Sequence, residues 1–227
     1  MADLPNLAIV LITYRRTREA VITVKSVAEN LDYPKELRGF YVADDGSPRE
    51  HVDAILGELN SQGEKVIGFH NEKYSPGTYF CGKGWNIGLY QGHQFSDVVL
   101  WLEDDWHLDR RLDLRPYVRL LLERMDVGAV RLGGLAVGSD VHIVGHDGIH
   151  YLRYERSTQY AYSGNPLLRH TRFLDFYGWF HEERNPGNIE LDMDSKFREA
   201  HGPDIWRPVD LGGWGVFGHI GTEKSWE

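Results

Sequence analysis

Short apolar runs alternate with amphipathic stretches through the first half of the chain, and this order restricts the fold more than any other feature of the sequence. Apolar runs at residues 7–14, 39–43, 66–69 and 98–102 predict strands, and the stretches between them predict helices. Near-continuous apolar strands that alternate with helices are typical of parallel sheets, because helices then cover both faces. The sequence therefore predicts an α/β fold with a Rossmann-like, mostly parallel sheet flanked by helices.

Two of the predicted helices carry start signals. An apolar stripe repeats at helical spacing over residues 20–31, and Thr17 is placed to cap its first turn. The next helix follows Ser47-Pro48-Arg49-Glu50, which matches a capping box with proline at the first helical position. A strand that ends at Asp44-Asp45-Gly46 is therefore predicted to run directly into a helix.

The chain has 227 residues, with 25 Lys or Arg and 34 Asp or Glu, so its formal net charge is −9. This excess of acid argues against non-specific nucleic-acid binding, which depends on neutralising phosphates. Because neither repeats nor a Ser/Pro/Gly linker interrupt the sequence, we interpret residues 1–227 as a single domain. The start of the sequence lacks a basic segment, and the apolar run after it is too short for a signal peptide or a membrane span. We therefore expect a cytoplasmic protein without a membrane span.

Polar and aromatic side chains follow two of the predicted strands at the point where each ends. Thr13-Tyr14-Arg15-Arg16 follows the first strand, and Asp44-Asp45-Gly46 follows the second. In doubly wound sheets, ligands bind outside the carboxyl ends of the strands. The arginines can pair with phosphate, Tyr14 can stack on a base, and the aspartates can accept hydrogen bonds from a ribose or a base edge. Solvated strand ends carry similar residues, so these loops alone leave both interpretations open.

Three consecutive carboxylates, Glu103-Asp104-Asp105, follow the apolar strand predicted at residues 98–102. Acids that lie close together in a partly buried site repel one another, which raises their pKa values unless a cation is bound. Oxygen ligands of this kind suit Mg²⁺ or Mn²⁺, which take one or two carboxylates together with phosphate oxygens of a substrate. The alternative is an acidic turn exposed to water.

In this order the motifs resemble those of nucleotide-diphospho-sugar glycosyltransferases of the GT-A fold, particularly the soluble inverting type. Residues 7–16 are similar to the opening strand and base-binding loop of that family, and residues 42–47 resemble its DDGS turn. Residues 82–88 resemble the Gly/Asn segment that lines the diphosphate, and residues 103–105 stand where the family has its DxD metal motif. The resemblance implies a GT-A fold in which residues 1–108 bind the nucleotide sugar and residues 109–227 bind the acceptor.

The resemblance also implies roles for individual residues. Those implied to contact the nucleotide sugar are Thr13, Tyr14, Arg15, Arg16, Asp44, Asp45, Lys83, Asn86, Glu103 and Asp104. The first position of the DxD motif is Glu here, as in relatives with an EDD triplet. Asp105 is therefore the implied direct ligand of Mn²⁺ or Mg²⁺, while Glu103 lies nearer the ribose or acts through water. His219 resembles the C-terminal histidine that completes the metal shell in some members.

A segment of the second half resembles the part of the family that carries the general base. The family often has a Glu-Asp pair at the start of a helix that ends in a basic residue, and residues 189–198 have this spacing with Leu191 in place of the usual Glu. On that register Asp192 takes the position of the base, six residues before Arg198. Glu190 is the other candidate, because it lies on the same predicted first turn. Acids at a helix N-terminus also stabilise the helix dipole, which alone would explain both residues.

The rest of the second half has less regular patterns. The predicted elements are a helix at residues 116–125, a strand at 127–132, a hairpin turning at Asp147-Gly148 and a helix at 190–200. Flat aromatic rings can cover the apolar faces of sugars. Trp179, Trp206 and Trp214 are therefore candidates for a sugar platform, with core packing as the alternative.

The reaction implied by the resemblance is transfer of a sugar from a nucleotide-diphospho-sugar to a hydroxyl acceptor, with a metal ion and with inversion at the anomeric carbon. UDP-sugars are the favoured donors, and a glycan, a lipid-linked glycan, a protein or a modified nucleobase could carry the accepting hydroxyl. A retaining enzyme and a non-catalytic carbohydrate-binding module stay as alternatives. A sugar-nucleotide pyrophosphorylase is disfavoured, because no Gly-rich phosphate loop follows the first strand.

Overall fold

A computed structural model of the chain describes residues 4–72, 81–133, 141–164, 166–182, 186–212 and 215–221. Its helices are α1 (Thr17–Asn30), α2 (Arg49–Ser61), α3 (Gly82–Phe95), α4 (Arg115–Glu123), α5 (Thr171–Tyr177) and α6 (Pro186–Glu199), with a 3₁₀ turn at Lys35–Leu37. No helix in these ranges is long and apolar enough to cross a membrane.

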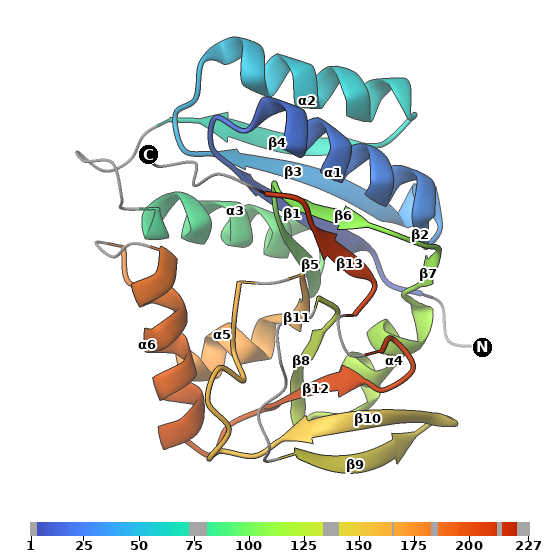
Figure 1. The fold of residues 1–227 in the computed structure, drawn as a ribbon, viewed down its shortest axis with the longest axis vertical. Helices are drawn as coiled ribbons and strands as arrows, with labels where there is room; N and C mark the ends of the chain where they lie inside the picture. Colours follow the sequence, from blue (N-terminus) through green and yellow to red (C-terminus); the bar gives the residue numbers. More distant parts are fainter. Residues whose placement is uncertain are drawn as a thin grey trace.

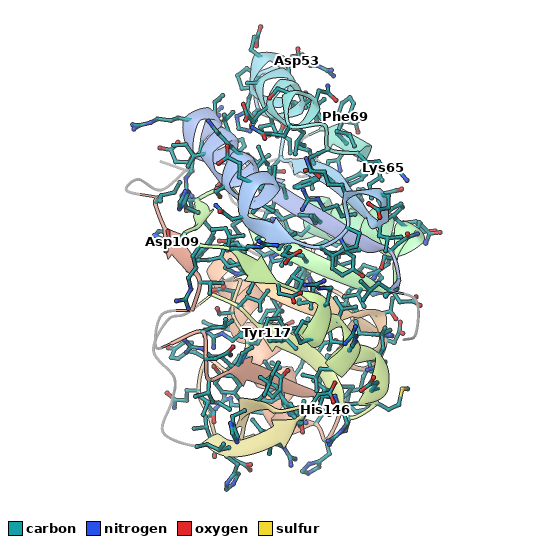
Figure 2. All side chains as sticks on the ribbon, turned by 90° about the vertical axis from the view of Figure 1, so that its right-hand side faces the viewer. Asp53, Lys65, Phe69, Asp109, Tyr117 and His146 are labelled. Carbon is teal, nitrogen blue, oxygen red and sulfur yellow. The ribbon has the colours of Figure 1, made fainter. Side chains whose placement is uncertain are left out.

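One large sheet runs through the described part of the molecule. Its strands are β1 (Leu7–Thr13), β3 (Arg38–Asp44), β4 (Val66–Asn71), β5 (Val98–Glu103), β8 (Val127–Arg131), β9 (Val141–His146), β10 (Ile149–Tyr154), β11 (Leu167–His170) and β12 (Asp204–Pro208). They lie in the order β4-β3-β1-β5-β11-β8-β12-β10-β9 (Figure 1). In Figure 2, Phe69 of β4 and His146 of β9 mark the two ends of this order, and Asp53 of α2 lies beyond β4.

Two small sheets complete the strands. β2 (Leu31–Asp32) pairs with β7 (Leu112–Asp113), and β6 (Trp106–Leu108) pairs with β13 (Phe217–His219). In the large sheet, β4, β3, β1 and β5 are parallel, whereas β11 is antiparallel to both of its neighbours and β10 is antiparallel to β9 and β12. The predicted α/β fold is confirmed, with a parallel N-terminal part and a mixed sheet beyond β5.

Strand β1 lies at the centre of the parallel part, and all seven of its residues are buried. Because side chains alternate between the faces of a strand, Leu7, Ile9 and Leu11 join one core with residues of α1, α2 and α4. The alternate residues of β1 join a second core with residues of α3, α5 and α6. Burial on both faces explains why the strand is a continuous apolar run in the sequence.

The first turns of α1 and α2 differ from the prediction. Thr17 is the first residue of α1 and not its cap, and its hydroxyl lies 2.8 Å from His51 Nδ1. Ser47 does not cap α2. The Ser47 hydroxyl instead donates to Asp44 Oδ1 at 2.5 Å and accepts from the backbone N–H of Arg15 at 2.8 Å. The Thr17 hydroxyl therefore connects α1 to α2, and the Ser47 hydroxyl connects the loops after β1 and β3.

In the second half, the hairpin predicted at Asp147-Gly148 is confirmed. Both turn residues have positive φ, 53° and 78°, as a two-residue type I′ turn between β9 and β10 requires. Helix α6 begins at Pro186, one turn before the predicted start at residue 190. Glu190 and Asp192 therefore lie beyond the first turn, where the helix dipole no longer explains them.

Helix α3 lies directly against β1 and β3 at Gly88. A Cβ atom at Gly88 would come within 2.8 Å of Ala43 Cβ and 3.2 Å of Val10 Cγ1. We expect Gly88→Ala to lower the free energy of unfolding by about 1–3 kcal/mol, because the helix must move away from the sheet. Gly57→Ala in α2 is the control: nothing lies within 4 Å of its Cβ position. It should raise the free energy by about 0.5–1 kcal/mol. Urea unfolding measures both, and equal effects would contradict the close packing at Gly88.

Candidate active site

Three neighbouring parallel strands end together at one edge of the sheet. The register of β1 pairs Thr13 with Asp44 of β3 on one side, and Ile12 with Glu103 of β5 on the other. The loops after these strands are therefore neighbours, as the sequence predicted for residues 13–16, 44–46 and 103–105. The candidate active site is built at this edge.

The middle residue of the acidic triplet holds the loop that follows β1. Asp104 Oδ2 accepts hydrogen bonds from the Thr13 hydroxyl at 2.9 Å and from the Tyr14 backbone N–H at 3.0 Å. Burial raises the pKa of Asp104 to about 7, although these hydrogen bonds oppose the rise. The Asp104 carboxylate is thus directed at the loop after β1, and its contact with the donor stays a prediction.

A buried histidine that sequence reasoning missed lies beneath the same loop. His51 Nε2 lies 2.7 Å from the Thr13 hydroxyl oxygen and 3.5 Å from Asp44 Oδ1, while Nδ1 contacts Thr17. Burial lowers the pKa of His51, against the opposing effect of Asp44. These contacts connect the loop after β1 to the turn after β3. In the sequence, His51 is indistinguishable from an ordinary polar residue in the first turn of a helix.

Asp44 is fully buried inside its own turn. Its carboxylate accepts hydrogen bonds from the Ser47 backbone N–H at 2.7 Å and from the Asn71 amide at 2.5 Å. Thr13 is buried as well, with 2% of its surface exposed. Their polar atoms bind other parts of the protein in this structure, and their contact with the donor stays a prediction. They shape the edge on which the more exposed residues lie.

The Gly/Asn segment at residues 82–88 forms the first turns of α3. The Asn86 amide donates to the Phe180 carbonyl at 2.9 Å, and its oxygen accepts from the Phe180 N–H at 3.0 Å. A Cβ atom at Gly82 would overlap the backbone of His181. Asn86 thus anchors the segment around Phe180. Direct contact with a nucleotide sugar stays a prediction for all ten residues to which the resemblance gave this role, Glu103 among them.

Asp105 and His219 come together although 114 positions separate them in the chain. The pairing of β13 with β6 places His219 opposite Trp106, and the two rings pack with centroids 5.1 Å apart. The Ile220 N–H donates to the Asp105 carbonyl at 2.8 Å. As a result, His219 Nε2 lies 3.1 Å from Asp105 Oδ2. The structure brings together the two residues that the resemblance implied as metal ligands.

One carboxylate oxygen of this pair is available to a divalent cation. Asp105 Oδ1 is buried and has no hydrogen-bond partner in the described part of the chain. Carboxylate oxygen and imidazole nitrogen are suitable ligands for Mn²⁺, and ions of this type commonly bind few protein groups beside substrate phosphates. Within the described ranges, no three His, Cys, Asp or Glu side chains converge as a metal site. Asp105 and His219 therefore fit an ion that takes its other ligands from substrate or water.

Two further carboxylates approach each other at Gly164. Glu190 Oε1 accepts the Gly164 N–H, and a Cβ atom at Gly164 would lie 2.5 Å from Glu103 Oε1 and 2.7 Å from Glu190 Oε1. Desolvation raises the pKa of Glu103 well above its ordinary value, and Glu190 and Asp105 add to the rise. Burial also raises the pKa of Glu190, against the effects of Gly164 and Arg131. Carboxylates with raised pKa values are candidates for proton transfer.

Asp192 lies on another side of α6. Two positions along a helix correspond to a rotation of about 200°, so Glu190 and Asp192 cannot face the same loop. The Asp192 carboxylate pairs with Lys196 at 3.0 Å. The structure brings Glu190, and not Asp192, to Glu103, which favours Glu190 as the base; the role of either residue stays a prediction.

The three candidate tryptophans have different environments. Trp206 is 1% exposed and packs on Tyr151, with ring centroids 5.5 Å apart, so it belongs to the core and not to a sugar platform. Trp179 is 40% exposed. Trp214 lies outside the described residues.

Solved structures share this arrangement of strands and helices. TarS from S. aureus matches with a TM-score of 0.66 and 15% identity, over 97% of this chain and 37% of that one. GalNAc-T7 with UDP, GalNAc and Mn²⁺ matches with a TM-score of 0.69 and 13% identity, over 100% and 46%. The mannosyltransferase PcManGT from Pyrobaculum calidifontis, with GDP-Man and Mn²⁺, matches with a TM-score of 0.55 and 15% identity, over 83% and 51%. No protein-family model matches the sequence, and the search of curated proteins gave no match.

These likenesses identify the class of fold. The chain has the GT-A fold, which confirms the fold that the motifs at the strand ends implied. It spans roughly 37–51% of the length of the three proteins. Because identity is low and coverage of those proteins is partial, these likenesses show the fold and not the activity.

Proposed function

We propose that this chain is a metal-dependent glycosyltransferase that moves a sugar from a nucleotide-diphospho-sugar to a hydroxyl acceptor. The observation that carries the proposal is the pair of Asp105 and His219, with a buried, unpartnered carboxylate oxygen, at the carboxyl ends of parallel strands. The nucleotides and Mn²⁺ named for the structurally similar proteins support the same chemistry. We favour a UDP-sugar as donor.

Asp105 and His219 would hold Mn²⁺ or Mg²⁺ at this edge. When bound, such an ion supplies positive charge that stabilises a departing diphosphate. Arg15, Arg16 and Lys83 belong to the same edge and would pair with phosphate oxygens. Tyr14 and Asp45 would contact the base and the ribose.

Glu190 is the general base of the proposed reaction. It accepts the proton of the acceptor hydroxyl, while the Gly164 N–H holds its carboxylate in place. Attack by that hydroxyl on the face opposite the leaving group inverts the anomeric carbon. A carbohydrate-binding module needs no such base. The acceptor would be a glycan, a lipid-linked glycan, a protein or a modified nucleobase, and a cytoplasmic location stays a prediction of the sequence.

A thermal-shift experiment tests the proposal without knowledge of the acceptor. With Mn²⁺ present, UDP at about 100 times its Kd should stabilise the protein by about 2.7 kcal/mol through binding to the folded state. For a chain of this size the expected rise in Tm is about 5–10 °C. The same UDP concentration with EDTA should give little shift. Equal shifts with and without Mn²⁺, or no shift at all, would reject a metal-dependent nucleotide site. If UDP gives the Mn²⁺-dependent shift, a hydrolysis screen of nucleotide sugars would identify the donor.

A further inference from the structure

The Arg16 side chain pairs with two carboxylates of the acidic triplet, Asp104 and Asp105. Its Nη1 contacts Asp105 Oδ2 and lies 3.3 Å from Asp104 Oδ1. The Arg16 side chain is 16% exposed, and the two carboxylates are 7% and 5% exposed. The same Asp105 oxygen lies 3.1 Å from His219 Nε2. Arg16 and His219 therefore both contact Asp105 Oδ2.

This contact leaves polar atoms unsatisfied on both partners. Within the described ranges, Arg16 Nε is buried without a hydrogen-bond acceptor, and Asp105 Oδ1 is buried without a donor. Arg16 precedes the first residue of α1 and has non-helical backbone angles, with φ −85° and ψ 64°. Arginine can donate to two phosphate oxygens at once, which would use the nitrogen that has no acceptor here.

The charges explain why an arginine lies there. Glu103, Asp104, Asp105 and Glu190 gather around the edge, and a buried group of carboxylates is unfavourable without a cation. Arg16 supplies one positive charge. A divalent ion at Asp105 would supply two and would repel a guanidinium on the same oxygen. Arg16 and the ion therefore compete for Asp105.

We propose that Arg16 is an exchangeable counter-ion: it pairs with Asp105 in the empty site and moves to the diphosphate when metal and nucleotide bind. The inference rests on the proposed function and adds to it. A metal ion that binds alone must displace Arg16 from Asp105, and the guanidinium then gains no new acceptor. When a nucleoside diphosphate binds with the metal ion, its phosphate oxygens become acceptors for the guanidinium. Arg16 thereby makes the binding of metal and nucleotide cooperative.

The variant Arg16→Gln separates this role from a structural one. Mn²⁺ binding without nucleotide, measured from the electron paramagnetic resonance signal of free Mn²⁺, should become about tenfold tighter. UDP binding at saturating Mn²⁺, measured by calorimetry, should become about tenfold weaker. A merely structural arginine would weaken both affinities or leave both unchanged. Arg16→Lys keeps the charge and should restore the Mn²⁺ affinity of the original protein to within about threefold.

Two comparisons make the outcome decisive. Arg18→Gln removes the same charge from an exposed position on α1 and should change each affinity by less than about twofold. Arg16→Met keeps the length of the side chain and repeats the test if the glutamine variant folds poorly. If the original protein does not bind Mn²⁺ and UDP, the proposed function fails. If it binds both, but neither Arg16→Gln nor Arg16→Met binds Mn²⁺ more tightly, the counter-ion role is overturned.

Discussion

Asp105→Ala is expected to reduce turnover of a nucleotide sugar at least about a hundredfold, because it removes the carboxylate that fits the metal. UDP should then give the same small thermal shift with Mn²⁺ as with EDTA. Initial rates of donor hydrolysis or transfer measure the first effect, and thermal unfolding measures the second. The side chain is 5% exposed, so the free energy of unfolding of the variant is measured in parallel.

Asp109→Ala is the matched control for this variant. Asp109 is an acid four positions later whose side chain is 58% exposed and contacts His107 at 2.8 Å (Figure 2). Exposed ion pairs of this kind contribute little, so the rate should stay within about twofold of the original protein. Full turnover by Asp105→Ala would reject the proposed role of Asp105, whatever the control shows.

Glu190→Gln is expected to lower the rate of sugar transfer by about 10²–10⁴, because the acceptor hydroxyl loses its general base. The affinity for UDP and Mn²⁺ should change by less than about threefold. The raised pKa of Glu190 also fixes the sign of a pH effect. The transfer rate of the original protein should fall as pH drops through that raised value, because the base becomes protonated, and the glutamine variant should lack this decrease.

Asp192→Asn decides between the two registers of α6. It removes the same charge two positions later, from a side chain that pairs with Lys196. The structure predicts that this variant keeps its transfer rate. An inactive Asp192→Asn beside an active Glu190→Gln would restore the register that sequence reasoning preferred.

The elements of the N-terminal part were predictable because their patterns have a direct physical cause. A central strand buried on both faces must be apolar throughout, and β1 is. Parallel strands place their carboxyl ends at one edge, so the positions of Thr13, Asp44 and Glu103 followed from the order of elements alone. The meeting of Asp105 with His219 was expected from the family resemblance and not from any local pattern.

The partners of the polar atoms at the strand ends were not predictable in the same way. Thr13, Asp44 and Asn86 have the residue types of ligand contacts, and in the structure they form hydrogen bonds with His51, Ser47 and Phe180. A side chain at a strand end can turn toward the protein or away from it, and the same sequence pattern is compatible with both orientations. The register of α6 is difficult to predict for a related reason, since a shift of one residue rotates a helix face by about 100°.

Buried arginines mark another limit of sequence reasoning. Arg169 is completely buried, 5.2 Å from the Trp101 ring centroid, and donates to the Tyr162 hydroxyl at 3.2 Å. Desolvation lowers the pKa of Arg169. Arginine is among the residues expected at the surface, so nothing in the strand pattern of residues 167–170 indicates this environment.

Crystals grown with UDP and Mn²⁺ would test the central claim most directly, through anomalous diffraction recorded at the manganese absorption edge. We predict a manganese peak within coordination distance of Asp105 and His219, next to the two phosphates of UDP. UDP bound at the strand ends without a peak there, or a peak whose ligands include neither residue, would contradict the account.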